Sequence, residues 1–165
     1  MGKPKCKYLY EKEKYYHIYN RGHRRSLIFQ EKKDYQHFCN LMLKYLKKYD
    51  IVLVGYCLIP NHYHMILRLG NSVSDISKFM HRFMTAYCSY FNRKYNLLGA
   101  VFQNPFQARK LDGYEDLLNM IEYLKQNPVE ARLVRKKGKY KWLYINRRSL
   151  KVLHRLYARL TSIEE

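Results

Sequence analysis

Acidic residues are scarce in this chain, with 13 Asp and Glu against 32 Lys and Arg, so the formal net charge at pH 7 is +19. The basic residues are spread along the whole chain rather than confined to one end. This imbalance favours a polyanionic partner, and nucleic acid is the first candidate. A membrane surface is the second choice, because 47% of the residues are hydrophobic and 16% are aromatic, which is typical of a folded globular domain.

Long apolar runs are also missing. The longest, residues 51–60, is too short to cross a bilayer, and no apolar segment follows the basic residues at the amino terminus. The sequence therefore predicts neither a membrane span nor a signal peptide. Only four cysteines occur, without a Cys-x-x-Cys spacing, and they are expected to be free thiols in a reducing cytoplasm. They are Cys6, Cys39, Cys57 and Cys88.

The chain has no internal repeat, low-complexity stretch or convincing linker, which favours one domain. Apolar residues in alternation predict strands, and apolar residues three and four positions apart predict helices. The expected strands are residues 15–20, 51–58, 62–69 and a short one near 106–110. The expected helices are residues 31–49, 75–95, 114–126 and 149–161. Pro128 is expected to end the third helix at about Asn127, because proline disfavours helical geometry in the residue before it.

The order of these elements indicates the fold. The tight turn at Pro60-Asn61 makes the two strands that it joins antiparallel. Two helices inserted between strands each carry one apolar stripe. The sequence therefore predicts an α+β sandwich of the ferredoxin-like type, in which helices pack on a small and largely antiparallel sheet.

Two histidines stand on the strand that follows this turn. Because successive side chains of a strand point to opposite faces, His62 and His64 share one face and could bind one metal ion together. A His-x-His pair is common by chance, however. From this motif alone, two ordinary surface or core-edge histidines are an equal alternative.

A second pair of side chains lies on the third predicted helix. Tyr123 and Asn127 are four residues apart, so they project from the same helix face. If that face lies over the strand with His62 and His64, one ion could have two imidazole ligands and one amide oxygen, with the Tyr123 phenol aimed at a bound phosphate. Such a site suits phosphodiester cleavage, with the metal ion as Lewis acid and the phenol as a nucleophile that forms a phosphotyrosine. Nearby cations, including the metal ion and Lys125, are expected to favour the phenolate.

Four stretches of the chain together resemble one protein family. Residues 62–64, His-Tyr-His, resemble a motif of two histidines around a bulky apolar residue. Residues 123–134 are similar to the signature Tyr-Ile-x-x-Asn-Pro-Val-x-Ala-x-Leu-Val, residues 15–22 to a first strand, and residues 99–103 to a Gly-x-Leu-Trp-Gln segment. All four occur in the HUH transposases of the insertion-sequence and REP-associated tyrosine transposase kind, which the chain therefore resembles.

This resemblance implies a fold of the HUH endonuclease type. Residues 1–134 would form the catalytic domain, and residues 135–165 a basic extension with a terminal helix within the same single domain. The implied reaction nicks and rejoins single-stranded DNA through a 5′-phosphotyrosine, at sites recognised by their hairpins. Insertion-sequence members act as dimers and REP-associated ones can be monomeric, so the resemblance leaves a homodimer open.

The resemblance also assigns roles to particular residues. Tyr123 matches the nucleophile, and His62, His64 and Asn127 match the ligands of a divalent metal ion, Mg²⁺ or Mn²⁺. Phe102 stands where relatives often have Trp, which removes no proposed catalytic group.

Three arginines are candidates for contacts with DNA phosphates. Arg21 and Arg24 follow the first predicted strand, and Arg109 leaves the last one. For the basic loop after the first strand, a solvated turn is an equal alternative. Removing these charges is expected to flatten the salt dependence of DNA binding.

Two other functions stay open at this point. One is a non-catalytic regulator that uses the same fold to bind hairpin DNA or RNA. The other is an unrelated RNA-binding protein with accidental histidines, which predicts that Tyr123 lies far from His62 and His64. The positions of these side chains in the structure distinguish that second alternative from the transposase.

Overall fold

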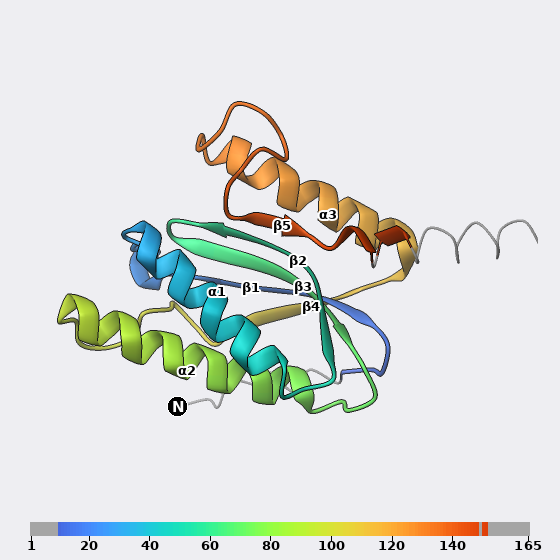
Figure 1. Cartoon of the computed structure of the whole chain (residues 1–165), viewed down its shortest axis with the longest axis horizontal. Coiled ribbons are helices and arrows are strands. Elements are labelled where there is room, and N and C mark those ends of the chain that lie inside the picture. The colour runs from blue at the N-terminus through green and yellow to red at the C-terminus, as the bar shows by residue number, and fades with distance from the viewer. Residues whose placement is uncertain (1–9, 149, 152–165) are drawn as a thin grey trace, which may run out of the picture.

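The computed structural model describes residues 10–148 and 150–151, which form five β-strands and three long α-helices. A short 3₁₀ turn follows the first strand at His23–Arg25. The elements are β1 (Tyr15–Arg21), α1 (Lys32–Leu46), β2 (Ile51–Ile59), β3 (His62–Leu69), α2 (Asp75–Tyr95), β4 (Gln107–Leu111), α3 (Gly113–Glu130) and β5 (Leu143–Ile145). In Figure 1 the sheet lies between α3 above and the pair α1 and α2 below.

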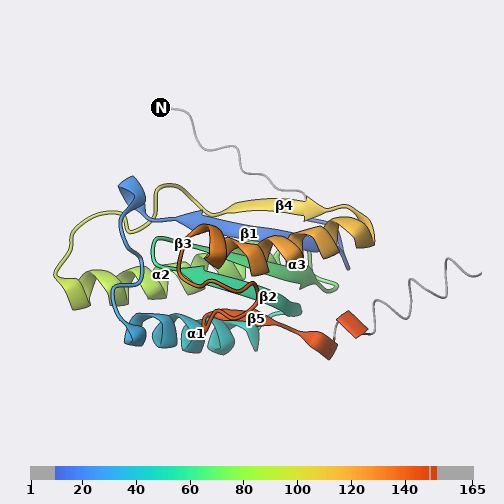
Figure 2. The same ribbon diagram turned by 90° about the horizontal axis from the view of Figure 1, so that it is seen from above.

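The sheet has the strand order β4-β1-β3-β2-β5, and every pairing in it is antiparallel. The hairpin of β2 and β3 turns at Pro60 and Asn61, as predicted. Figure 2 shows the strands side by side beneath α3. The α+β sandwich with an antiparallel sheet is thus confirmed, and α2 has the bounds that its apolar stripe predicts.

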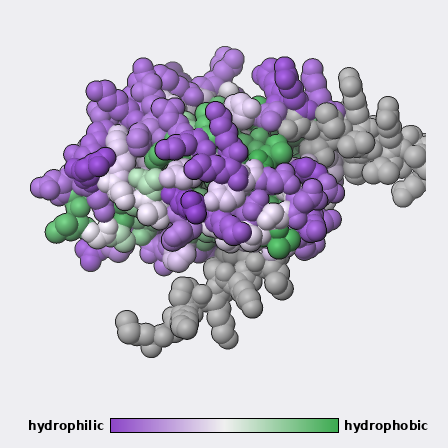
Figure 3. Space-filling model, turned by 60° about the horizontal axis from the view of Figure 1, so that its bottom comes forward, coloured by the Kyte–Doolittle hydropathy of each residue, from purple (hydrophilic) through white to green (hydrophobic). Residues whose placement is uncertain are grey.

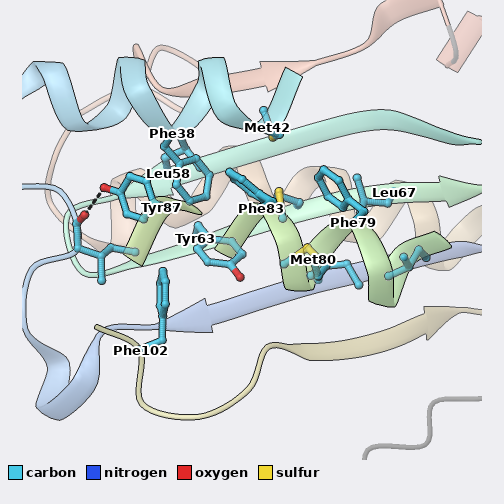
Figure 4. Close-up of a cluster of buried hydrophobic side chains, with 14 of the residues drawn as sticks. Phe38, Met42, Leu58, Tyr63, Leu67, Phe79, Met80, Phe83, Tyr87 and Phe102 are labelled. Carbon is cyan, nitrogen blue, oxygen red and sulfur yellow. Dashed lines mark hydrogen bonds between the residues drawn. The ribbon is translucent and has the colours of Figure 1, made fainter. Parts of the chain in front are cut away.

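The core between the sheet and the helices α1 and α2 is rich in aromatic rings (Figure 4). Phe38 of α1 lies with its ring centroid 4.7 Å from that of Phe83 in α2 and 5.4 Å from that of Tyr63 in β3. Tyr87 is also fully buried, and its hydroxyl donates a hydrogen bond to the carbonyl of Ile28. This pairing removes the cost of burying a polar hydroxyl in an apolar core.

A buried carboxylate ties the start of α1 to the end of α2. Asp34 is completely buried, and it accepts hydrogen bonds from two backbone N–H groups at the N-terminus of its own helix. It also accepts hydrogen bonds from Tyr90, Lys94 and Tyr95 of α2. Burial by itself raises the pKa of Asp34, but the hydrogen bonds from Lys94 and Tyr95 outweigh it and lower the pKa to about 2.

A second core lies on the opposite face of the sheet, under α3. Leu117, Ile121 and Leu124 of α3 pack there against strand residues such as Ile66. β5 closes this core at one edge of the sheet, where it approaches β2 closely. A Cβ atom on Gly55 would lie 2.9 Å from the backbone oxygen of Tyr144, so only glycine fits this position without a shift of the backbone.

The third helix corrects one prediction. It continues through Asn127 and Pro128 to Glu130 instead of ending at Asn127. Proline removes one backbone hydrogen-bond donor from the helix. The turn after it is still closed by a 2.9 Å hydrogen bond from the Ala131 N–H to the Asn127 carbonyl. Asn127 and Pro128 are both buried, and this burial offsets the unfavourable effect of the proline on the helix. The helix ends where Arg132 takes a φ of 55°.

Other differences are smaller. The first predicted helix is shorter at both ends, and β5 is an additional strand within the segment predicted as a basic tail. Of the predicted helix 149–161, Leu150 and Lys151 are helical, and the rest lies outside the described residues. Cys39, Cys57 and Cys88 are free, as predicted, and Cys6 is not among the residues described.

The surface agrees with the composition. Figure 3 shows one face that is mostly hydrophilic, with hydrophobic side chains in small separate spots. Over residues 10–148 and 150–151, no helix combines the length and apolar character that a membrane span requires.

Candidate active site

The two predicted metal-binding histidines lie at the start of β3 and point to the face covered by α3. Tyr63 and Met65, which alternate with them, are buried in the aromatic core on the other face. The rings of His62 and His64 lie at right angles to each other, with their centroids 5.1 Å apart. His64 is buried and His62 is half-buried. The alternation of side chains along the strand therefore brings the two imidazoles together, as the sequence predicts.

The last turns of α3 bring the other two predicted residues to the same place. The Tyr123 ring lies edge-on to that of His64, with 5.2 Å between centroids. The Asn127 amide donates a 3.0 Å hydrogen bond to the Tyr123 hydroxyl. Tyr123 is 39% exposed, whereas Asn127 is buried. This proximity is the opposite of what a protein with accidental histidines predicts.

These side chains open onto a cavity of about 390 Å³. The cavity lies where β1 ends and β3 begins, and its walls are mainly polar and aromatic side chains. They are Tyr19, Asn20, Arg21, His62, His64, Gln103, Asn104, Gln107 and Tyr123. Arg21 of β1 lies opposite His62 of β3 in the sheet. Its charge acts to lower the pKa of both His62 and Tyr123. The cavity thus has a cationic side, which suits a phosphate group.

A third histidine completes the cluster, and sequence reasoning gave it no role. His17 on β1 is buried, and its Nε2 lies 2.9 Å from Nδ1 of His64. Its ring stacks on that of Tyr19 at 4.8 Å. The alternation of His17 and Tyr19 along one strand face was visible in the sequence. The pairing of β1 with β3 that places His17 beside His64 was not.

The three histidines are held in their neutral forms. Burial, as the largest effect, lowers the pKa of His64 to about 2 and the pKa of His17 and His62 to about 4. Positive charge on Arg21 acts in the same direction on His62 and His64, while the nearby Asn127 side chain opposes the shift at His62. Neutral imidazole is the form that binds a metal ion. At neutral pH the site therefore offers ring nitrogens with free lone pairs.

The donor atoms fit a divalent cation. His64 Nε2 and Asn127 Oδ1 are buried without a hydrogen-bond partner among the described residues. Leaving such atoms unpaired is costly, and a cation would satisfy both. His62 has its Nδ1 engaged by Asn61 Oδ1 at 2.7 Å, which leaves Nε2 available. In the described part of the chain no three His, Cys, Asp or Glu side chains are arranged for a metal ion, so a site with two histidines would need a donor of another type, such as the Asn127 amide oxygen.

The described side chains around Tyr123 do not by themselves lower the pKa of its phenol. Burial raises the pKa of Tyr123, and the hydrogen bond from Asn127 and the charge of Arg21 oppose this rise only in part. Lys125, which was expected to favour the phenolate, forms an ion pair with Glu122. Desolvation therefore outweighs the neighbouring cations, and the protein side chains alone keep the phenol protonated at neutral pH.

The three arginines proposed for DNA contacts differ in their surroundings. Arg21 is exposed at the cavity, and Arg24 is exposed in the 3₁₀ turn after β1 with a φ of 50°. Arg109 instead forms a two-point ion pair with Asp116, with distances of 2.7 and 3.1 Å. Arg21 and Arg24 are therefore better placed for phosphate contacts than Arg109.

A histidine pair on a central strand, facing a helical tyrosine and asparagine, is the arrangement that the resemblance to single-tyrosine HUH transposases predicts. The chain belongs to the family of IS200-like transposases, whose model matches residues 11–127. No curated protein matches the sequence.

The solved structures that are similar to this one include the following two. A REP-associated tyrosine transposase bound to a REP hairpin aligns with a TM-score of 0.71 at 19% identity, over 93% of this chain and 88% of that chain. At this identity the similarity establishes a shared fold. A protein of Deinococcus radiodurans R1 assigned as a transposase aligns with a TM-score of 0.45 at 16% identity, over 77% of this chain and 97% of that chain, which is too weak to support an argument.

Proposed function

We propose that this transposase nicks and rejoins single-stranded DNA by a metal-dependent reaction with Tyr123 as nucleophile and a 5′-phosphotyrosine as intermediate. The observation that supports it most directly is the position of the Tyr123 hydroxyl. It accepts a hydrogen bond from Asn127, and the Tyr123 ring lies edge-on to that of His64. Both Asn127 and His64 have a buried ligand atom without a hydrogen-bond partner among the described residues. One site thus combines a nucleophile with the donors for a Lewis acid.

The chain's own residues perform most of this chemistry. A divalent cation, Mg²⁺ or Mn²⁺, bound by His62, His64 and Asn127 would polarise the scissile phosphate. Asn127 orients the Tyr123 oxygen by donating a hydrogen bond to it, and Tyr123 lines the cavity. Arg21 supplies positive charge at the cavity, where it stabilises both the phosphate and the phenolate.

The proposed step conserves the phosphodiester energy. The phenol loses its proton to solvent, its oxygen forms a bond to phosphorus, and the bond from phosphorus to the 3′-oxygen breaks. The released 3′-oxygen takes up a proton and becomes a hydroxyl. Attack of a 3′-hydroxyl on the phosphotyrosine reverses the step and restores Tyr123, so a strand can be joined as well as cut.

The proposed substrate is single-stranded DNA that carries a hairpin. The net charge of +19 supports a nucleic-acid partner, and the structural relative with a TM-score of 0.71 is bound to a REP hairpin. Exposed aromatic side chains in the cavity, such as Tyr19, could stack on unpaired bases beside the hairpin.

The proposal is tested by trapping the intermediate. Hairpin oligonucleotides labelled at the 3′ end are incubated with the protein and Mn²⁺, because the fragment with the 5′-phosphate stays attached to the enzyme. We expect a labelled adduct on a denaturing gel, its loss with a chelator, and a nucleotide-modified peptide that contains Tyr123. Hairpin binding without any adduct would instead identify a non-catalytic regulator.

The proposed phosphate contacts predict a change in salt dependence. Arg21→Ala and Arg24→Ala should each reduce the slope of log affinity for hairpin DNA against log salt by about 1, because each contact releases a counterion. Arg109→Ala should change the slope less, because Asp116 already neutralises its guanidinium. The matched control is Arg68→Ala, which removes an arginine paired with Glu13 at the far end of β3. An unchanged slope for Arg21→Ala would contradict the contact.

A further inference from the structure

His17 contacts the metal-binding cluster from outside the catalytic cavity. The cavity wall includes His64 but not His17, which lines a separate cavity with Asp116 and Tyr123. His17 nevertheless approaches His64 within hydrogen-bond distance, at 2.9 Å. We propose that His17 is a positioning residue, which accepts the Nδ1–H of His64 and so fixes the tautomer whose Nε2 can bind a cation. The inference rests on the proposed function.

Two arrangements of the proton between these rings are conceivable. Either His64 Nδ1–H donates to His17 Nε2, or His17 Nε2–H donates to His64 Nδ1. A neutral imidazole carries one N–H, so the second arrangement places a hydrogen on His64 Nε2. That nitrogen is buried without a partner, and a buried unpaired donor costs free energy. In the first arrangement the same nitrogen keeps a lone pair, which a cation can use.

The surroundings of His17 favour the first arrangement as well. With Nε2 as acceptor, His17 carries its own hydrogen on Nδ1. Unlike Nε2 of His64, this atom is not buried without a partner. The second cavity, which His17 lines together with Arg109 and Asp116, provides polar groups near this ring. The N–H of His17 therefore has polar groups near it, whereas an N–H on His64 Nε2 would have no hydrogen-bond partner among the described residues.

His62 provides an internal comparison. Its Nδ1 lies 2.7 Å from Asn61 Oδ1, and an amide oxygen can only accept. His62 is therefore held with its hydrogen on Nδ1 and its Nε2 free. With His17 as acceptor, both ligand histidines have the same tautomer, each fixed by a neighbour outside the ligand set.

The position of His17 in the sheet makes it a rigid support. Its backbone pairs with Ile66 of β3 on one side and with Arg109 of β4 on the other. Its ring stacks on Tyr19 at 4.8 Å and on His64 at 5.1 Å. A side chain that is confined in this way holds the His64 ring in one orientation before any cation binds.

The tautomer can be measured on the metal-free protein. Long-range ¹H–¹⁵N correlation spectra of the full ¹⁵N-labelled chain distinguish a histidine with hydrogen on Nδ1 from one with hydrogen on Nε2. We expect the Nδ1–H form for His64 in the wild type and a mixture of both forms in His17→Phe. An Nε2–H form of His64 in the wild type would overturn the proposal, whatever the activity of the protein.

Metal affinity provides the second measurement. Isothermal titration with Mn²⁺ should show a 10- to 100-fold weaker affinity for His17→Phe, which is the usual cost of removing an outer partner of a ligand. His17→Gln keeps an acceptor oxygen and should bind Mn²⁺ more tightly than His17→Phe. A packing role alone predicts the reverse order, because Phe preserves the ring stacking and Gln does not. The control is His81→Phe, an exposed histidine of α2, which should bind as the wild type does.

The outcomes separate this inference from the proposed function. If the wild type forms no adduct with DNA, the nucleophilic function fails, and the tautomer of His64 can still be determined. If the adduct forms and Mn²⁺ binds equally to the wild type and His17→Phe, with both variants folded by circular dichroism, only the role of His17 fails.

Discussion

Replacing Tyr123 with Phe should abolish the covalent protein–DNA adduct and reduce the rate of strand cleavage on the order of 10⁴-fold or more. The substitution removes only the hydroxyl that would attack phosphorus. Its ring can stay beside His64, and the lost hydrogen bond to Asn127 is at a partly exposed position. Hairpin binding should therefore stay close to that of the wild type. Single-turnover cleavage of a 3′-labelled hairpin oligonucleotide, analysed on denaturing gels, measures both effects.

The matched control for this substitution is Tyr144→Phe. Tyr144 lies on β5, and its exposure of 42% resembles the 39% of Tyr123. It should form the adduct at the wild-type rate. An adduct that persists in Tyr123→Phe would show that a different tyrosine is the nucleophile, and peptide mapping would then identify it.

Replacing Asp34 with Ala should lower the free energy of unfolding by about 3 kcal/mol. The substitution removes a helix cap, deprives two tyrosine hydroxyls of their acceptor in a partly buried site, and removes one of the two carboxylates that pair with Lys94. Urea denaturation followed by circular dichroism measures this difference. Glu13→Ala breaks an exposed ion pair with Arg68 and should cost less than about 1 kcal/mol. Equal losses in the two variants would contradict the structural role of Asp34.

The same carboxylate predicts the direction of a pH effect. Its pKa falls from 3.8 in the unfolded chain to about 2 in the folded protein, so the folded state favours the charged form. The stabilisation is fully present above pH 3.8 and is lost as the pH falls through about 2. The difference in free energy of unfolding between the wild type and Asp34→Asn should therefore decrease as the pH falls from about 4 to about 2. A difference in free energy of unfolding that stays constant over this range would contradict the lowered pKa of Asp34.

The sequence predicted the elements that carry their own periodic pattern. β3 could be assigned because its apolar residues alternate, and this assignment was enough to place His62 and His64 on one face. The spacing of Tyr123 and Asn127 on an apolar-striped helix predicted their common face in the same way. These sequence patterns alone did not predict that Tyr123 and Asn127 lie beside the two histidines. It depends on the packing of α3 against the second core, which involves residues far apart in the sequence.

Other features could not be predicted because their cause lies in long-range pairing. β5 spans only Leu143–Ile145, which is too short for a periodic signal, and it forms because β2 offers a free edge and a glycine at the point of closest approach. The contact of His17 with His64 requires the register of β1 against β3. The helical position of Pro128 reflects burial, which a local rule about proline does not include.

The register of β3 links correct folding to the assembly of the candidate site. A slip by one residue would turn Tyr63 and Met65 toward α3 and would drive His62 and His64 into the aromatic core. The strand pairing that completes the core therefore also assembles the proposed cutting site. A compact but mispaired molecule would lack the histidine pair beside Tyr123, which the proposed cleavage requires. Under the proposed function, an error in strand pairing would therefore remove the cutting activity together with the site.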